Sequence, residues 1–155
     1  MLTGLALAVA DVPLAMIEQE HLETRRHERG GEAELQFLFR AAERLLPVWH
    51  EERLQLVRWG NRRGESRALP STRWARLETF EGGGWGRWGP PRSSSPRCRA
   101  CTSRSTIASA WSVCGLLVRD ETGLLRVYPL VEPASHYYAV MTKSDWMPVL
   151  IDERI

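Results

Sequence analysis

Six arginines and two tryptophans share one short stretch of the chain, residues 58–76, and their chemistry is the easiest in the sequence to define. Guanidinium groups neutralise phosphates, and an exposed indole stacks on an unpaired base. The stretch therefore predicts weak, electrostatic binding of single-stranded nucleic acid, with Arg58, Trp59, Arg73 and Arg76 as the predicted contacts. The alternative is that both tryptophans are core residues and the arginines solvate a loop. The complete set is Arg58, Trp59, Arg62, Arg63, Arg67, Arg73, Trp74 and Arg76.

The other residue types that could support chemistry lack the spacing that chemistry requires. The pair Cys98 and Cys101 has zinc-ligand spacing, but a structural zinc site needs four ligands and Cys114 is the remaining cysteine. The serines are not in a nucleophile-elbow motif, and the histidines have no motif around them. The sequence predicts no metal site, no cofactor and no complete catalytic site.

Periodicity predicts the elements that must position these side chains. Apolar residues at helical spacing predict helices over 12–29 and 33–46, with Gly30 and Gly31 as a helix stop. From residue 46 the period changes to that of strands. The predicted strand segments are two strands within 46–60, one over 74–80, a hairpin of 114–119 with 124–131, and a closing strand over 147–151. A helix or loop is predicted near 136–142.

Residues 87–112 do not resemble the sequence around them. The stretch is rich in serine, arginine and proline and shows no hydrophobic period, so we predict an irregular segment. If the serines use TCN codons, a frame that starts one base earlier has T at the centre of each new codon, and such codons encode Phe, Leu, Ile, Met or Val. The shifted frame would then encode strand-like sequence. We therefore hypothesise that the segment is out of frame, which the nucleotide sequence would test.

Three separated segments carry a resemblance to a known family. They are Leu46-Pro-Val with Leu56-Val-Arg-Trp-Gly60, Trp74-Ala-Arg-Leu-Glu-Thr79, and Pro133-Ala134 with Asp145-Trp-Met-Pro-Val-Leu-Ile151. Together they resemble the SOS-response-associated peptidases, the abasic-site processing proteins. The resemblance covers about half of the chain, from Leu46 onward. It implies a partner, abasic single-stranded DNA, and it implies that Arg76 contacts this DNA.

The same resemblance fails at the positions that carry the family's chemistry. Family members use a cysteine directly after the initiator methionine to bond to the opened sugar, and this chain has Leu2, which offers no nucleophile. The asparagine of the second motif falls on Trp74, and the histidine of the last falls on Ser144. The sequence therefore predicts a diverged and inactive relative. The alternative is a non-catalytic nucleic-acid-binding or interaction domain.

Length and composition limit the number of domains and the class of fold. The 155 residues, 43% hydrophobic and 26% charged, fit a single domain with a core of its own. We predict an α+β fold with a twisted, mostly antiparallel sheet that curls toward a barrel, with flanking helices. The N-terminal part, 1–45, is expected to be helical, and 46–155 rich in sheet. The three cysteines fit a reducing cytoplasm, and no apolar run is long enough for a membrane span.

Overall fold

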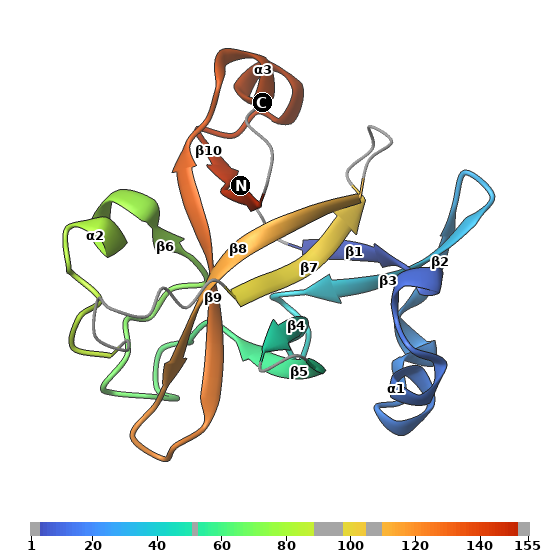
Figure 1. The fold of residues 1–155 in the computed structure, drawn as a ribbon, viewed down its shortest axis with the longest axis horizontal. Helices are drawn as coiled ribbons and strands as arrows, with labels where there is room; N and C mark the ends of the chain where they lie inside the picture. Colours follow the sequence, from blue (N-terminus) through green and yellow to red (C-terminus); the bar gives the residue numbers. More distant parts are fainter. Residues whose placement is uncertain (1–3, 51–52, 89–97, 105–109, 152–155) are drawn as a thin grey trace.

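A computed structural model of the chain describes residues 4–50, 53–88, 98–104 and 110–151. The predicted α+β class is confirmed, since strands and short helices alternate along the chain (Figure 1). The N-terminal elements are β1 (Gly4–Ala8), η1 (Val9–Asp11), α1 (Leu14–Gln19), η2 (Leu22–Arg25), β2 (Arg26–Arg29) and β3 (Glu32–Leu38). The central elements are β4 (Leu45–His50), β5 (Arg53–Trp59), β6 (Ala75–Arg76) and α2 (Leu77–Glu81). The C-terminal elements are β7 (Cys98–Arg104), β8 (Ala110–Arg119), β9 (Leu125–Pro133), α3 (His136–Thr142), β10 (Trp146–Pro148) and β11 (Leu150–Ile151).

The strands form a small N-terminal sheet and a larger one. The small sheet has the order β1-β3-β2 and is antiparallel throughout. The larger sheet runs β10-β9-β5-β4-β7-β8-β11, and β8 also pairs with β9, so the sheet curls back on itself. Its described pairings are antiparallel except β5 with β9 and β6 with β9, as the predicted mostly antiparallel sheet requires.

The helical N-terminal part was predicted wrongly. Residues 12–29 form only the short α1 and η2 before β2, and residues 32–38 form β3. Gly30 and Gly31 both have positive φ, 61° and 83°, and Arg29 pairs with Glu32, which is a two-residue hairpin turn rather than a helix stop. Leu35 and Phe37 then point to the core at strand spacing, 1% and 0% exposed.

The segment predicted to be irregular contains strands. β7 occupies residues 98–104, and β8 begins at residue 110. β7 pairs with β4 on one side and β8 on the other, so the neighbouring backbones form this strand although its sequence lacks a hydrophobic period. The other residues of 87–112 lie partly outside the described residues, and the reading-frame hypothesis remains a prediction.

Predictions for the rest of the sheet are confirmed with one exception. β4 and β5 form the antiparallel pair expected within 46–60, and β8 and β9 form the expected hairpin, with Gly123 at a φ of 82°. Of the helix or loop expected near 136–142, the structure has the helix, α3, and the expected last strand is divided into β10 and β11. The exception is 74–80, where β6 takes two residues and α2 follows.

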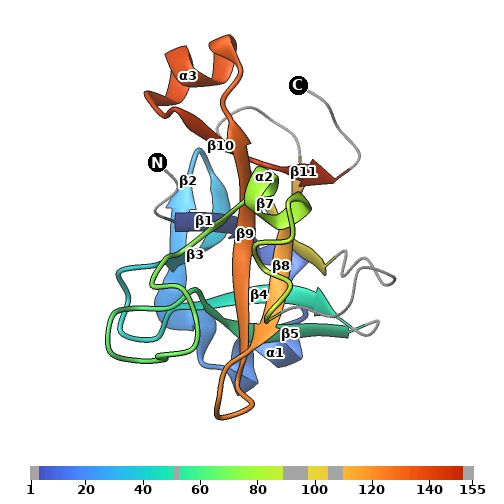
Figure 2. The ribbon, with the colours of Figure 1, turned by 90° about the vertical axis from the view of Figure 1, so that its left-hand side faces the viewer.

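Side chains alternate across β8 and β9, so this hairpin has a hydrophobic cluster on each face. Leu117 and Val127 belong to a cluster that includes Leu7, Phe37 and Trp59, and so joins the N-terminal sheet to β4 and β5. On the other face lies a second cluster, formed by Leu69, Ala75, Trp85, Leu116, Val118, Tyr128 and Leu130. Figures 1 and 2 show α2 on one side of β8 and β9 and the N-terminal elements on the other.

Candidate functional site

The connection from β5 to β6, residues 60–74, is irregular chain held in place by polar contacts. Gly60 turns the chain with a φ of 59°, and its N–H donates to the carbonyl of Val127 at 2.8 Å. The buried amide of Asn61 donates to the carbonyls of Ser66 and Leu69, at 3.0 and 2.9 Å, and accepts from the N–H of Ser66. These bonds fix the conformation of the connection without help from a helix or strand.

An ionic network built on two buried arginines joins this connection to the rest of the chain. The Arg44 guanidinium is bonded to the Glu65 carboxylate and donates from Nε to the Trp59 carbonyl at 2.8 Å. Arg126 donates to Glu65 at 3.1 Å and, through Nε, to Asp120 at 2.9 Å. Both arginine side chains are almost fully buried, and each therefore needs these partners. Glu65 thus ties the connection to β9 and to the residue before β4.

The pKa values of both carboxyls follow from these contacts. The bond from Arg44 is the largest influence on Glu65 and, with contacts from Arg62 and Arg126, it lowers the pKa to about 2 against the opposing effect of burial. Burial by itself raises the pKa of Asp120. Hydrogen bonds from Thr122, Arg126 and Leu124 outweigh it and lower the pKa to about 2. Both carboxyls are ionised at neutral pH.

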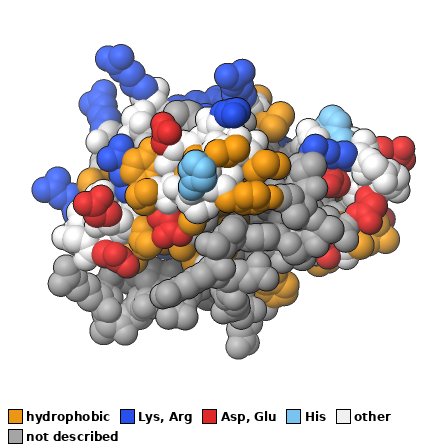
Figure 3. Space-filling view, turned by 90° about the horizontal axis from the view of Figure 1, so that it is seen from above, with side chains coloured by type: hydrophobic (Ala, Val, Ile, Leu, Met, Phe, Trp, Pro, Cys, Tyr) orange, Lys and Arg blue, Asp and Glu red, His pale blue; other side chains and the backbone are white. Residues whose placement is uncertain are grey.

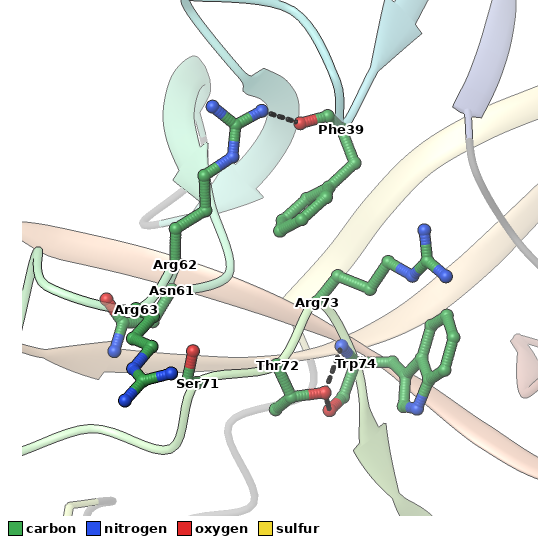
Figure 4. A pocket seen from close by; sticks show the side chains of 8 residues that line it. All are labelled: Phe39, Asn61, Arg62, Arg63, Ser71, Thr72, Arg73 and Trp74. Carbon is green, nitrogen blue, oxygen red and sulfur yellow. Dashed lines mark hydrogen bonds between the residues drawn. The ribbon is translucent and has the colours of Figure 1, made fainter.

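A shallow groove of about 350 Å³ opens beside this connection (Figure 4). It is lined by Phe39, Asn61, Arg62, Arg63, Ser71, Thr72, Arg73 and Trp74. In Figure 4, Arg63 lies beside Ser71 on one side, whereas Arg73 and Trp74 lie on the other. We call this hollow the arginine groove.

Aromatic rings contact two arginine side chains of the groove, Arg62 and Arg73, and also the buried Arg44. The guanidinium groups of Arg44, Arg62 and Arg73 lie 5.3, 5.4 and 5.8 Å from the centre of the Phe39 ring. The Arg73 guanidinium also lies 4.5 Å from the centre of the Trp74 ring. Phe39 in turn packs edge-on against Trp59, with ring centres 5.5 Å apart.

The described lining of the groove includes three arginines and no carboxylate, and the Glu65 carboxylate on the same connection is already bonded to two buried arginines. Residues 58–76 contain six arginines and one acidic residue, Glu65, which is bonded to Arg44 and Arg126. Arg62 donates to the carbonyls of Phe39 and Ala41, at 2.5 and 3.2 Å, which orients the guanidinium and leaves its charge in place. Arg63 is exposed. The groove can therefore hold a phosphate between fixed cations, next to a half-buried indole.

The four predicted nucleic-acid contacts do not form one site. Arg73 lines the arginine groove. Trp59 does not, because it is 0% exposed and its Nε1 donates to the Arg73 carbonyl at 2.7 Å; the prediction that it stacks on a base is corrected to a core role. Arg58 is exposed, and since it neighbours Trp59 on β5 it points to the opposite face. Arg76 is exposed on β6, with its guanidinium 4.6 Å from the centre of the Trp146 ring.

Phe39 is the groove residue that sequence reasoning missed. Its place at helical spacing marked it as a core residue of a helix, whereas it lies just beyond β3 and is half-buried among the guanidinium groups. One signal could have revealed it: a hairpin turn at Gly30 and Gly31 implies a strand that ends near residue 38.

Ser144, which stands where the resembled family has a histidine, has a structural role here. The Ser144 hydroxyl donates to the Trp146 carbonyl at 2.7 Å and accepts from the Trp146 N–H at 3.3 Å, so it closes a tight turn. Leu2 lies outside the described residues. Within the described part of the chain, no group of three or more His, Cys, Asp or Glu side chains could hold a metal ion.

The end of the molecule that carries α3 exposes large hydrophobic side chains. Tyr137, Val140 and Met141 are 58%, 50% and 60% exposed, and Figure 3 shows hydrophobic side chains gathered on this face. Among the described residues, no helix is both long and apolar enough to cross a membrane.

Comparisons of the chain with protein-family models, with curated proteins and with solved structures found no match.

Proposed function

We propose that this chain is a non-catalytic domain that binds single-stranded nucleic acid at the arginine groove. The observation that carries the proposal is the placement of Arg62, Arg63 and Arg73 around one hollow beside the indole of Trp74. Fixed guanidinium groups next to an accessible ring are the elements that recognise a phosphate backbone with unpaired bases. The rigid connection beneath them reduces the entropy that binding must overcome.

Salt dependence of binding to a labelled (dT)12 oligonucleotide tests this proposal. Log affinity should fall linearly with log salt, and Arg63→Ala should reduce the slope by about 0.7, the value for one single-strand phosphate contact. Arg58→Ala is the matched control, since it removes an exposed arginine from the other face of β5. The groove is not the binding site if affinity does not change with salt concentration. The same holds if the slope of log affinity against log salt is equal for Arg63→Ala and the unmodified protein.

A second candidate is an inactive relative of the abasic-site processing proteins. One observation favours it: the three segments that carry the resemblance converge on β9, because β5, β6 and β10 all pair with that strand. We expect no covalent adduct with abasic single-stranded DNA, as Leu2 offers no nucleophile. An adduct that survives denaturation would show that another nucleophile is present.

A further inference from the structure

A second pair of guanidinium and indole groups lies outside the arginine groove. The Arg76 guanidinium is 4.6 Å from the centre of the Trp146 ring, close to the 4.5 Å between Arg73 and the Trp74 ring. Neither Arg76 nor Trp146 lines the groove. The sequence separates Trp74 from Trp146 by 72 positions, so only the fold relates the two pairs.

β9 brings Arg76 and Trp146 together. Arg76 on β6 and Pro148 on β10 pair with the same residue, Val131, from opposite sides of β9. Trp146 lies two residues from Pro148 and therefore on the same face of the sheet. Arg76 shares this face through its pairing with Val131, so its guanidinium reaches the Trp146 ring across β9.

Trp146 is held in this position from both ends. Its backbone N–H and carbonyl are both bonded to the Ser144 hydroxyl, and the Arg76 guanidinium lies against its ring. The side chain is nevertheless only half-buried. A ring that is fixed in orientation and partly open can stack on a base with little loss of side-chain entropy.

The second pair continues the surface of the first. Trp74 and Arg76 flank Ala75, which is 1% exposed, so they lie on the outward side of the same extended segment. Three residues of extended chain span at most about 11 Å, which bounds the Cα separation of Arg73 and Arg76. The groove and the second pair therefore lie along one short path.

From this placement we infer that Trp146 is a second stacking platform, so that the chain binds at least two unpaired bases, one at Trp74 and one at Trp146. Arg76 acts as a positioning residue for the Trp146 ring. The inference rests on the proposed function and adds to it the length of the ligand, a single-stranded oligonucleotide longer than the groove itself.

Binding of a length series, from the mononucleotide pdTp to (dT)12, tests the inference with the full chain. For the unmodified protein, affinity should rise with length until both platforms are occupied. Trp146→Leu should weaken binding of (dT)12 by about 5- to 150-fold, the fold-change that corresponds to one stacked base. It should leave binding of pdTp unchanged, because this ligand has one base and its phosphates bind at the arginine groove. Arg63→Ala should weaken binding at every length.

Two further variants separate stacking from folding. Trp146→Phe keeps an aromatic face and should retain most of the length dependence that Trp146→Leu loses. Trp49→Leu removes a tryptophan that is 50% exposed on β4 and does not line the groove, and it should change nothing.

The outcomes distinguish the two proposals. If the unmodified protein binds no oligonucleotide, the proposed function fails and the inference fails with it. If binding depends on Arg63 but Trp146→Leu has no effect at any length, the function stands and Trp146 is not a platform. Equal weakening by Trp146→Leu at all lengths also overturns the inference, because it would place Trp146 within the first subsite.

Discussion

The arginines of this chain divide into two physical classes that look alike in the sequence. Arg44 and Arg126 are 3% exposed and bonded to carboxylates, so they stabilise the connection between β5 and β6. Arg62 and Arg63 lie at the surface of the same connection, where Arg62 is oriented by carbonyl oxygens. The ion pairs of the two buried arginines therefore fix the backbone that carries the two surface arginines, and so fix where their positive charge lies.

The ionic network predicts a specific acid sensitivity. The folded-state pKa of Glu65 is about 2, below its ordinary value of 4.5, and that of Asp120 is about 2, below 3.8. Because both values are depressed, the stabilisation is fully present above about pH 4.5 and is lost as the pH falls toward 2. The Asp120 carboxylate should contribute on the order of 2 kcal/mol to the free energy of unfolding. Glu65 should contribute less than its pKa shift alone implies, because its side chain is 27% exposed and solvent screens the charge.

Urea unfolding at a series of pH values from about 7 to 2 measures this effect. Glu65→Gln should lower the free energy of unfolding at neutral pH and give a shallower loss between about pH 4.5 and 2 than the unmodified protein. Glu78→Gln changes an exposed glutamate and is the matched control. An unchanged pH profile in Glu65→Gln would show that the network does not carry the acid sensitivity.

The two tryptophans of residues 58–76 show which side-chain exposures the sequence could predict. Trp59 and Trp74 both lie beside arginines, and both were eligible to stack on a base. The strand period puts Trp59 in the core, whereas Trp74 comes just before β6 in irregular chain, and no local period describes its exposure. The position of the arginine cluster was predictable from the sequence, but the selection of its members depends on contacts with Phe39, 23 positions before Arg62.

At the scale of elements, short-range signals predicted turns and hairpins but not the N-terminal sheet. The turn at Gly123 and the strands on either side of it were read correctly because the glycine and the alternation agree. The apolar residues of 33–46 fit a helix as well as a strand, and the pairing of β3 with β1 and β2 decided between them. β7 was missed for the same reason, since its neighbours supply the pairing.

Gly60 is the turn residue on which the arginine groove depends most directly. It has a φ of 59°, and a Cβ at this position would lie 2.6 Å from the Thr72 carbonyl oxygen and 2.8 Å from the Arg73 Cα. Gly60→Ala should therefore cost about 2–5 kcal/mol, the sum of left-handed strain and backbone displacement. It should also weaken oligonucleotide binding, because the atoms displaced belong to the groove.

Gly64 provides the matched comparison for this prediction. It too has a positive φ, 91°, but a Cβ there meets no atom within 4 Å. Gly64→Ala should cost only about 1–2 kcal/mol in urea unfolding. Equal costs for the two variants would mean that the close approach of residues 72 and 73 to Gly60 does not constrain the groove.

For the whole molecule, the two sheets are joined by one hydrophobic cluster. Leu7 and Phe37 of the N-terminal sheet pack in the same cluster as Val48 and Val127 of the larger sheet. The boundary expected near residue 45, between a helical part and a sheet-rich part, therefore does not divide the molecule into two cores. A shared core of this kind predicts that the two sheets unfold together.

The positions of the tryptophans allow a direct test of this coupling. All seven lie at residue 49 or later, so tryptophan fluorescence reports on the larger sheet and its connections and not on β1, β2 or β3. Leu7 is 2% exposed in β1, and Leu7→Ala should lower the free energy of unfolding by about 2–5 kcal/mol. If the core is shared, the fluorescence transition in urea should move by the full amount and coincide with the far-UV circular dichroism transition.

The control is Leu14→Ala, which changes a side chain that is 66% exposed and should move neither transition. A fluorescence midpoint that stays in place while the circular dichroism transition splits would show that the N-terminal sheet folds independently of the sheet that carries the groove.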